Sequence, residues 1–196
     1  MSENGNAALW FVDRHLEEGR GDKAAYREAG TGRGLSYAEL AQQSDRIAGA
    51  FHRAGIRREE RVACLVLDQI EYPAIFFGAM KAGVVPVLLN TLLTPDLYDL
   101  ILRDSRAAVL IVSDALWPSV EPAVKANPYL RHVFVIGEAP EGTTSFDDFV
   151  AGAEPAAAVE ASPDDCAFWL YSSGSTGQPK GVRHVPGARL MKWMAR

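Results

Sequence analysis

The stretch YSSGSTGQPKG, residues 171–181, contains the densest group of side chains that could bind a ligand. Its serine and threonine hydroxyls can donate hydrogen bonds, and its lysine carries a compact positive charge. Its glycines can adopt positive φ and bring successive backbone N–H groups close to an anion. Together these groups predict a site for a polyphosphate. The candidate binding residues are Ser172, Ser173, Gly174, Ser175, Thr176, Gly177 and Lys180.

Two other interpretations of this stretch fit less well. A standard P-loop has the pattern G-x-x-x-x-G-K-[ST]. Counted from Gly174, the second glycine of that pattern falls on Pro179, so the pattern does not match. A flexible linker would share the Ser- and Gly-rich composition. It would not explain the apolar run CAFWLY directly before the stretch, or Lys180 near its end. We therefore favour phosphate binding.

The four histidines offer less chemistry than this stretch. His184 follows it directly and could act as a base, but a histidine with no partner at a known distance is more often structural. The other three lie on expected helices or at a strand entry, and we expect them to be ordinary, partly exposed residues: His15, His52 and His132. We assign no catalytic residue.

The acidic residues and cysteines show no metal-ligand spacing. Paired carboxylates are typical here of solvated helix ends and loops. These pairs are 17–18, 59–60, 147–148 and 164–165. Cys64 and Cys166 lie in apolar runs, and we expect both to be reduced and to pack in the core as small hydrophobic residues.

Apolar runs alternate with amphipathic stretches along most of the chain. Unbroken apolar strands between amphipathic helices indicate a mostly parallel sheet with helices on both faces, so the expected fold class is α/β. The expected strands are 61–67, 84–89, 107–113, 131–137 and 166–171. The expected helices are 6–19, 37–55, 71–83, 94–106, 114–127 and 145–152. A short hairpin is expected to pair 23–28 with 34–39.

Local signals mark the ends of several helices. Ser36 followed by Glu39 predicts a capping box, and Gly55 predicts the end of the same helix. Thr94 and Pro95 predict the cap and first turn of a later helix. The first helix is expected to bury one apolar stripe, formed by Leu9, Val12 and Leu16.

The strand 166–171 connects the fold to the candidate site. Ligands of parallel α/β sheets bind outside the carboxyl ends of the strands. This strand leads directly into the phosphate-binding stretch, which we therefore expect at that edge of the sheet. The polar, Ala-rich segment 152–165 before it is expected to be an exposed connection.

Composition and charge exclude several functional classes. The chain has 196 residues, of which 48% are hydrophobic and 23% charged, as in a globular protein. A net charge of -5 argues against broad binding to nucleic acid or to an anionic membrane. The most membrane-like stretch, 72–90, is interrupted by Lys81, Gly83 and two prolines, so it fits a helix, a turn and a strand better than a span. With no secretory signal at the N-terminus, we expect a cytoplasmic location.

The stretch 171–181 resembles the phosphate-binding signature of the adenylate-forming superfamily, which includes acyl-CoA synthetases, nonribosomal peptide adenylation domains and luciferases. LSYAEL at 35–40 and MKAGVVPVLLN at 80–90 are similar to earlier signatures of that family. FVDRHLEEGRGDKAAY, NTLLTPDLYDLILRDSRA and FWLYSSGSTGQPKGV resemble its benzoate-CoA ligase branch, which includes 4-hydroxybenzoate-CoA ligases. The resemblance covers about residues 7–184.

The resemblance implies the N-terminal part of the large domain of such an enzyme, and a reaction in two steps. Benzoate or hydroxybenzoate attacks the α-phosphate of ATP to give an acyl-adenylate and pyrophosphate, and the thiol of coenzyme A then displaces AMP. By resemblance, residues 172–177 surround the leaving pyrophosphate and Lys180 contributes charge, with Mg²⁺ as a companion ion.

The end of the chain departs from the family pattern. We expect residues 1–184 to be a partial N-terminal AMP-binding domain and 185–196 a divergent basic tail, with the C-terminal domain absent. Pro186 and Gly187 would break the helix that relatives have here. One hypothesis is a shifted reading frame or premature end, which translation of the downstream DNA in all three frames would test.

Three functional interpretations remain open from the sequence. The first is the N-terminal fragment of an aromatic acid-CoA ligase, inactive by itself because the family's catalytic lysine and acyl pocket lie beyond Arg196. The second is another acyl-CoA ligase or an amino-acid adenylation domain. The third is a noncatalytic nucleotide-binding fragment. A sheet that stops midway would have an open edge, which a homodimer would cover.

Overall fold

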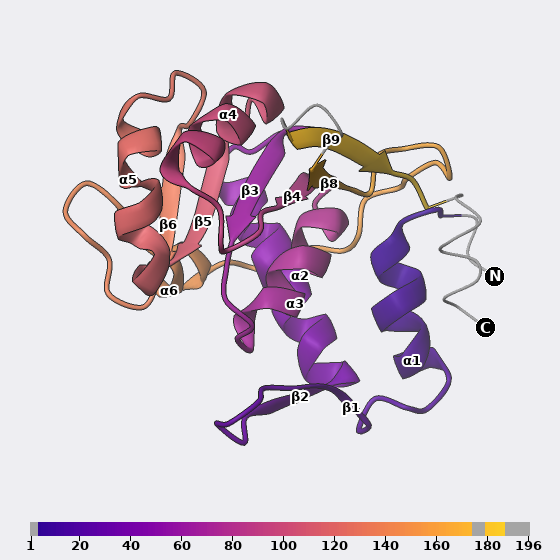
Figure 1. The fold of residues 1–196 in the computed structure, drawn as a ribbon. Helices are drawn as coiled ribbons and strands as arrows, with labels where there is room; N and C mark the ends of the chain where they lie inside the picture. The colour runs from indigo at the N-terminus through magenta and orange to yellow at the C-terminus, as the bar shows by residue number, and fades with distance from the viewer. Residues whose placement is uncertain (1–3, 174–178, 187–196) are drawn as a thin grey trace.

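The fold is a seven-stranded sheet with helices on both faces, and the computed structural model describes residues 4–173 and 179–186 (Figure 1). The strand order is β7-β6-β5-β3-β4-β8-β9. Neighbouring strands are parallel from β7 to β8, and β9 pairs antiparallel with β8 at the edge. The predicted fold class is confirmed. The strands are β3 Arg61–Leu65, β4 Val85–Leu88, β5 Val109–Ser113, β6 His132–Ile136, β7 Thr144–Ser145, β8 Phe168–Ser173 and β9 Pro179–His184.

The helices form two layers around this sheet. Residues of α2, α3 and α6 pack on one face, and residues of α4 and α5 pack on the other. Alternation along β3 explains the two cores, because Val62 and Cys64 join the first whereas Ala63 and Leu65 join the second. The helices are η1 Leu9–Asp13, α1 Arg14–Glu17, α2 Tyr37–Arg53, α3 Glu71–Lys81, α4 Pro95–Ser105, η2 Asp114–Leu116, α5 Trp117–Lys125 and α6 Phe146–Val150.

The start of α2 follows its predicted cap. The Glu39 backbone N–H donates to Ser36 Oγ at 3.2 Å, and the Ser36 backbone N–H donates to Glu39 Oε2 at 2.8 Å, which completes the capping box. Gly55 has a φ of +69° directly after the helix, as its predicted end requires. The predicted hairpin before α2 is also present, with β1 Ala24–Arg27 antiparallel to β2 Gly34–Ser36.

The prediction for the first helix is partly wrong, whereas Thr94 and Pro95 begin α4 as predicted. Val12 is fully buried as expected, but Leu16 is 39% exposed. The reason is that η1 is a π-helical segment, whose wider turns rotate the later side chains away from an ideal α-helical stripe. Thr94 occupies the N-cap position before Pro95, but its side chain makes no capping hydrogen bond.

The segment 152–165 is an irregular connection that packs against the fold more closely than predicted. Ala153 is buried, and the Val159 N–H donates to the Lys81 carbonyl at 2.8 Å. A Cβ at Gly49 of α2 would overlap the Glu154 carbonyl oxygen, so only glycine allows this approach. The connection thereby fixes the route of the chain from α6 to β8.

Lys81 is fully buried at the end of α3, where the sequence alone suggested only an interruption of an apolar stretch. Its ammonium contacts Asp13 Oδ1 at 2.8 Å and Asp45 Oδ1 at 2.6 Å. These partners lie in η1 and α2, so one buried cation joins three elements. No helix in the described ranges is long and apolar enough to cross a membrane.

Candidate phosphate-binding hairpin

The described residues of the predicted phosphate-binding stretch, 171–173 and 179–181, lie on the antiparallel strands β8 and β9, which form a hairpin (Figure 1). The predicted strand 166–171 is shifted, because β8 runs from Phe168 to Ser173 and so includes two of the candidate serines. The strand β9 was not predicted. Four further candidate residues lie outside the described residues: Gly174, Ser175, Thr176 and Gly177.

Ser172 and Lys180 face each other across the hairpin. Directly opposed residues of an antiparallel pair project their side chains from the same face, with Cβ atoms about 4.5–5.5 Å apart. Both residues are exposed. Within residues 4–173 and 179–186, no carboxylate forms an ion pair with Lys180. A hydroxyl donor and an available ammonium thus lie side by side, as the binding of an anionic oxygen requires.

The next pair along the hairpin projects from the opposite face. It consists of Tyr171 and Gly181. The Tyr171 phenol donates a hydrogen bond to Asp104 Oδ2 of α4 at 2.6 Å. Burial raises the pKa of Tyr171, and the hydrogen bond to the Asp104 carboxylate raises it further, so the phenol stays protonated at neutral pH.

His184 lies at the opposite end of the hairpin from the loop. It pairs with Phe168 across the ladder, and the two rings are stacked with centroids 4.3 Å apart and an interplanar angle of 3°. At about 3.3 Å per residue, its Cα lies roughly 13 Å from that of Lys180. This position favours the structural interpretation of His184 over a role as a base next to the phosphates. His132 is half-buried, and burial lowers its pKa.

A polar contact at the carboxyl ends of β3 and β5 was missed from the sequence. Ser113 is 1% exposed, and its hydroxyl accepts from the Leu67 N–H at 3.0 Å and donates to Gln69 Oε1 at 3.0 Å. These bonds fix the turn after β3 at the edge where ligands of such sheets bind. The available signal was a serine that ends an otherwise apolar strand.

The acidic pair 59–60 is not simply solvated, which corrects the sequence interpretation. The Glu60 carboxylate accepts two hydrogen bonds from Arg131, at 2.9 Å and 2.6 Å, and its side chain is only 16% exposed. Asp165 likewise pairs with Arg58 at 2.6 Å. Each ion pair joins two segments that are far apart in the sequence and lie at the amino ends of strands. We therefore assign these pairs a structural role. The described residues include no cluster of three or more metal-ligating side chains.

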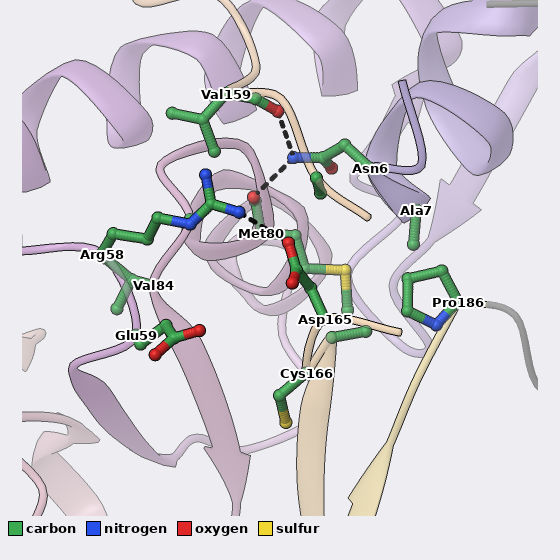
Figure 2. A pocket seen from close by; sticks show the side chains of 13 residues that line it. Asn6, Ala7, Arg58, Glu59, Met80, Val84, Val159, Asp165, Cys166 and Pro186 are labelled. Atoms are coloured by element: carbon green, nitrogen blue, oxygen red, sulfur yellow. Dashed lines mark hydrogen bonds and ion pairs between the residues drawn. The ribbon is translucent and has the colours of Figure 1, made fainter. Parts of the chain in front are cut away.

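A small cavity lies at the amino ends of β3, β4 and β8 (Figure 2). Its volume is about 30 Å³, enough for one water molecule and too small for an aromatic acid or a nucleotide. Cys166 lines it and is partly exposed, contrary to the expectation of a core cysteine, and its sulfur accepts from the Trp169 indole at 3.0 Å. Cys64 is buried as predicted, and burial raises its thiol pKa to about 12.

One family model matches most of the chain. The model of the AMP-binding enzyme family matches residues 12–190. The chain belongs to the AMP-binding enzyme family. The matched residues include both strands of the candidate hairpin, β8 and β9.

Individual members of the AMP-binding family confirm the resemblance to its aromatic branch. The chain is 44% identical over 184 residues to the 4-hydroxybenzoate-CoA/benzoate-CoA ligase of Rhodopseudomonas palustris, covering 92% of this chain and 33% of that enzyme. It is 43% identical over 188 residues to the benzoate-CoA ligase of Thauera aromatica, covering 94% and 35%. The crystal structure of the anthranilate CoA ligase AuaEII with anthranoyl-AMP superposes with a TM-score of 0.86 at 35% identity, covering 95% and 36%. The chain thus spans about a third of the length of these relatives.

Proposed function

We propose that this chain supplies the phosphate-binding part of an ATP-dependent aromatic acid-CoA ligase. The observation that carries the proposal is the Ser172–Lys180 pair, which places a hydroxyl and an ammonium on one face at the loop end of the hairpin. In this proposal residues 1–184 belong to the partial AMP-binding domain, and 185–196 are a tail of divergent, basic sequence. The ligase acts in the cytoplasm, where ATP and coenzyme A are available.

The proposed chemistry uses the hairpin to stabilise charge. As a benzoate or hydroxybenzoate carboxylate attacks the α-phosphate of ATP, negative charge grows on the departing pyrophosphate. Ser172 and Lys180 can bind its oxygens with groups that are already in place, which lowers the cost of reorganisation. In the proposal, Ser173 and the four residues 174–177 complete this phosphate-binding site. Mg²⁺ bound to the phosphates supplies additional positive charge.

The thioester step extends the proposal to coenzyme A. Its thiol sulfur attacks the acyl-adenylate carbonyl, a C–S bond forms as the thiol proton passes to solvent, and AMP leaves with the electrons of the broken C–O bond. We assign no residue of the described chain to this step. The choice of an aromatic acid is supported by the relatives that act on benzoate and hydroxybenzoate.

Exchange of labelled pyrophosphate into ATP tests the proposal. The 196-residue chain alone is expected to show none. A chimaera of residues 1–184 with the remaining part of the Rhodopseudomonas palustris ligase is expected to show exchange that depends on benzoate. Octanoate is the control for dependence on the acid, because the acyl pocket of the chimaera comes from the Rhodopseudomonas palustris part. A folded chimaera that shows no exchange with benzoate would refute the proposed phosphate-binding role of residues 1–184.

A further inference from the structure

Tyr171 connects the candidate hairpin to the helix that packs beside it. Its phenol donates to Asp104 Oδ2 of α4 at 2.6 Å, and α4 lies next to the loop end of the hairpin (Figure 1). Because side chains alternate along a strand, Tyr171 points away from the face that carries Ser172 and Lys180. It cannot contact a ligand bound on that face, so any effect on binding must pass through the backbone.

The ring of Tyr171 lies against the backbone of β9. A Cβ added at Gly181 would lie 3.1 Å from Tyr171 Cζ and 3.3 Å from its Oη, which is closer than ordinary contact. Because Gly181 has no side chain, the Tyr171 ring can lie directly against the backbone of β9. This contact occurs at the cross-strand pair adjacent to Ser172 and Lys180, so it helps to set the separation of the strands there.

The central sheet gives this end of the hairpin little direct support. The ladder between β4 and β8 consists of the pairs Val87–Trp169 and Leu88–Leu170. No later pair joins these strands in the described part of the chain, although β8 continues to Ser173. Beyond Leu170, the hydrogen bond from Tyr171 is therefore a tie between the hairpin and the rest of the fold.

The acceptor of this tie lies on a firmly held helix. Arg61, at the start of β3, donates from Nε to the Ser105 carbonyl at 2.7 Å and from Nη2 to the Arg106 carbonyl at 3.3 Å. These bonds satisfy carbonyls at the end of α4, which an isolated helix leaves without partners. Ile101 and Leu102 of the same helix are fully buried. The backbone of α4 is thus held relative to the centre of the sheet next to Asp104, whose side chain is exposed.

We propose that Tyr171 is a positioning residue that, through its hydrogen bond to Asp104, holds Ser172 and Lys180 in the geometry that binds phosphate. This inference rests on the proposed function. Without the bond, the hairpin end samples more conformations, and binding must then supply the free energy of ordering it. The residue acts on affinity through the strand and makes no contact with the phosphates.

Binding of magnesium pyrophosphate to the whole 196-residue chain, measured by calorimetry, tests the inference. Tyr171→Phe keeps the ring and removes only the hydrogen-bond donor, and we expect the Kd to rise about 5- to 20-fold, as for the loss of one bond to a charged group. Asp104→Ala should cause the same loss. Asp104→Asn, whose amide oxygen can still accept, should stay within about 2-fold of the wild type. Tyr129→Phe, at another partly exposed tyrosine, should change nothing.

Non-additivity separates this role from a general loss of stability. The double variant Tyr171→Phe/Asp104→Ala should bind as weakly as either single variant, because both remove the same bond. The inference would be overturned if the fold-increase in Kd of the double variant equalled the product of the two single increases. It would also be overturned if Tyr171→Phe bound with the affinity of the wild type. A Kd of Asp104→Asn as high as that of Asp104→Ala would also overturn it.

Amide hydrogen exchange of the ligand-free chain keeps the two proposals distinguishable. Tyr171→Phe should speed the exchange of residues 180–183 about 5- to 20-fold while the exchange of β3 stays unchanged. If the wild type does not bind pyrophosphate, the proposed function fails, and the inference fails with it. If the wild type binds pyrophosphate but the exchange of residues 180–183 does not change, only the inference fails.

Discussion

Ser172 and Lys180 are opposed residues of an antiparallel strand pair, and they project from the same face of the β8–β9 hairpin. The two ends of the candidate phosphate-binding stretch are therefore joined by the β8–β9 ladder in the ligand-free chain. A loop of glycines and serines alone would have to be ordered on binding, at a cost in conformational entropy. The strand pair reduces that cost.

Lys180 is expected to act in adenylation. In the chimaera with the Rhodopseudomonas palustris ligase, Lys180→Ala should slow benzoate-dependent pyrophosphate exchange by about 10- to 1000-fold, the range for the loss of one contact to developing charge. Lys125→Ala removes an exposed lysine on the distant helix α5 and should leave the rate unchanged. Equal rates for the two variants would remove Lys180 from the mechanism.

Lys81 is expected to be essential for stability. Lys81→Met keeps the length of the side chain but leaves the carboxylates of Asp13 and Asp45 near each other without a cation. Removing one partner of a buried ion pair typically costs about 3–5 kcal/mol, and the partial exposure of the two aspartates favours the lower end. Urea denaturation at pH 7 measures this loss. The matched Lys125→Met should cost less than about 0.5 kcal/mol, because the pair of Lys125 with Glu121 is exposed.

The stability contribution of Glu60 is expected to depend on pH. Hydrogen bonds from Arg131, followed by those from Arg57, lower the pKa of Glu60 from 4.5 to about 2. A carboxylate with a lowered pKa in the folded state stabilises the fold above pH 4.5, and this contribution is lost as the pH falls towards 2. Glu60→Gln should therefore lower the free energy of unfolding by about 1–2 kcal/mol at pH 7.

The pH series provides the check on that expectation. Urea denaturation at pH 7, 4 and 2.5 should show a difference between wild type and Glu60→Gln that shrinks as the solution becomes more acidic. A constant difference across the series would contradict the role assigned to the ionised carboxylate. Glu121→Gln, in an exposed pair, is the control.

The exposed apolar pair Leu170 and Val182 is expected to promote self-association. The two residues are cross-strand partners on β8 and β9, and they are 38% and 45% exposed. An edge strand with exposed apolar side chains is a template for further pairing. Val182→Lys should therefore lower the weight-average mass seen by sedimentation at high concentration. Leu67→Lys, at a similarly exposed leucine away from the hairpin, should not.

The sequence predicts the layers of this fold better than the details of its edges. The alternation of apolar strands and amphipathic helices, the Ser36 cap and the first hairpin depend on local patterns, and the structure confirms them. The strand β9 was missed because its exposed and polar residues give no apolar run, and only pairing with β8 makes it a strand.

Ion pairs between residues far apart in the sequence could not be predicted from local sequence patterns. Glu60 is 71 residues from Arg131 in the sequence, and Lys81 is 68 residues from Asp13. Nothing in the neighbouring residues indicates which distant charge each one will meet. At the candidate site, the residue types predicted phosphate binding, but the shared face of Ser172 and Lys180 follows only from the register of the hairpin.

Titration of the isotopically labelled chain with magnesium pyrophosphate, followed through its backbone amide resonances, tests the central claim most directly. The account predicts saturable shifts at Ser172, Ser173 and Lys180, with no comparable shifts at Cys166 beside the small cavity, and loss of these shifts in Lys180→Ala. Unchanged resonances in the hairpin at millimolar pyrophosphate, with the chain folded, would contradict it.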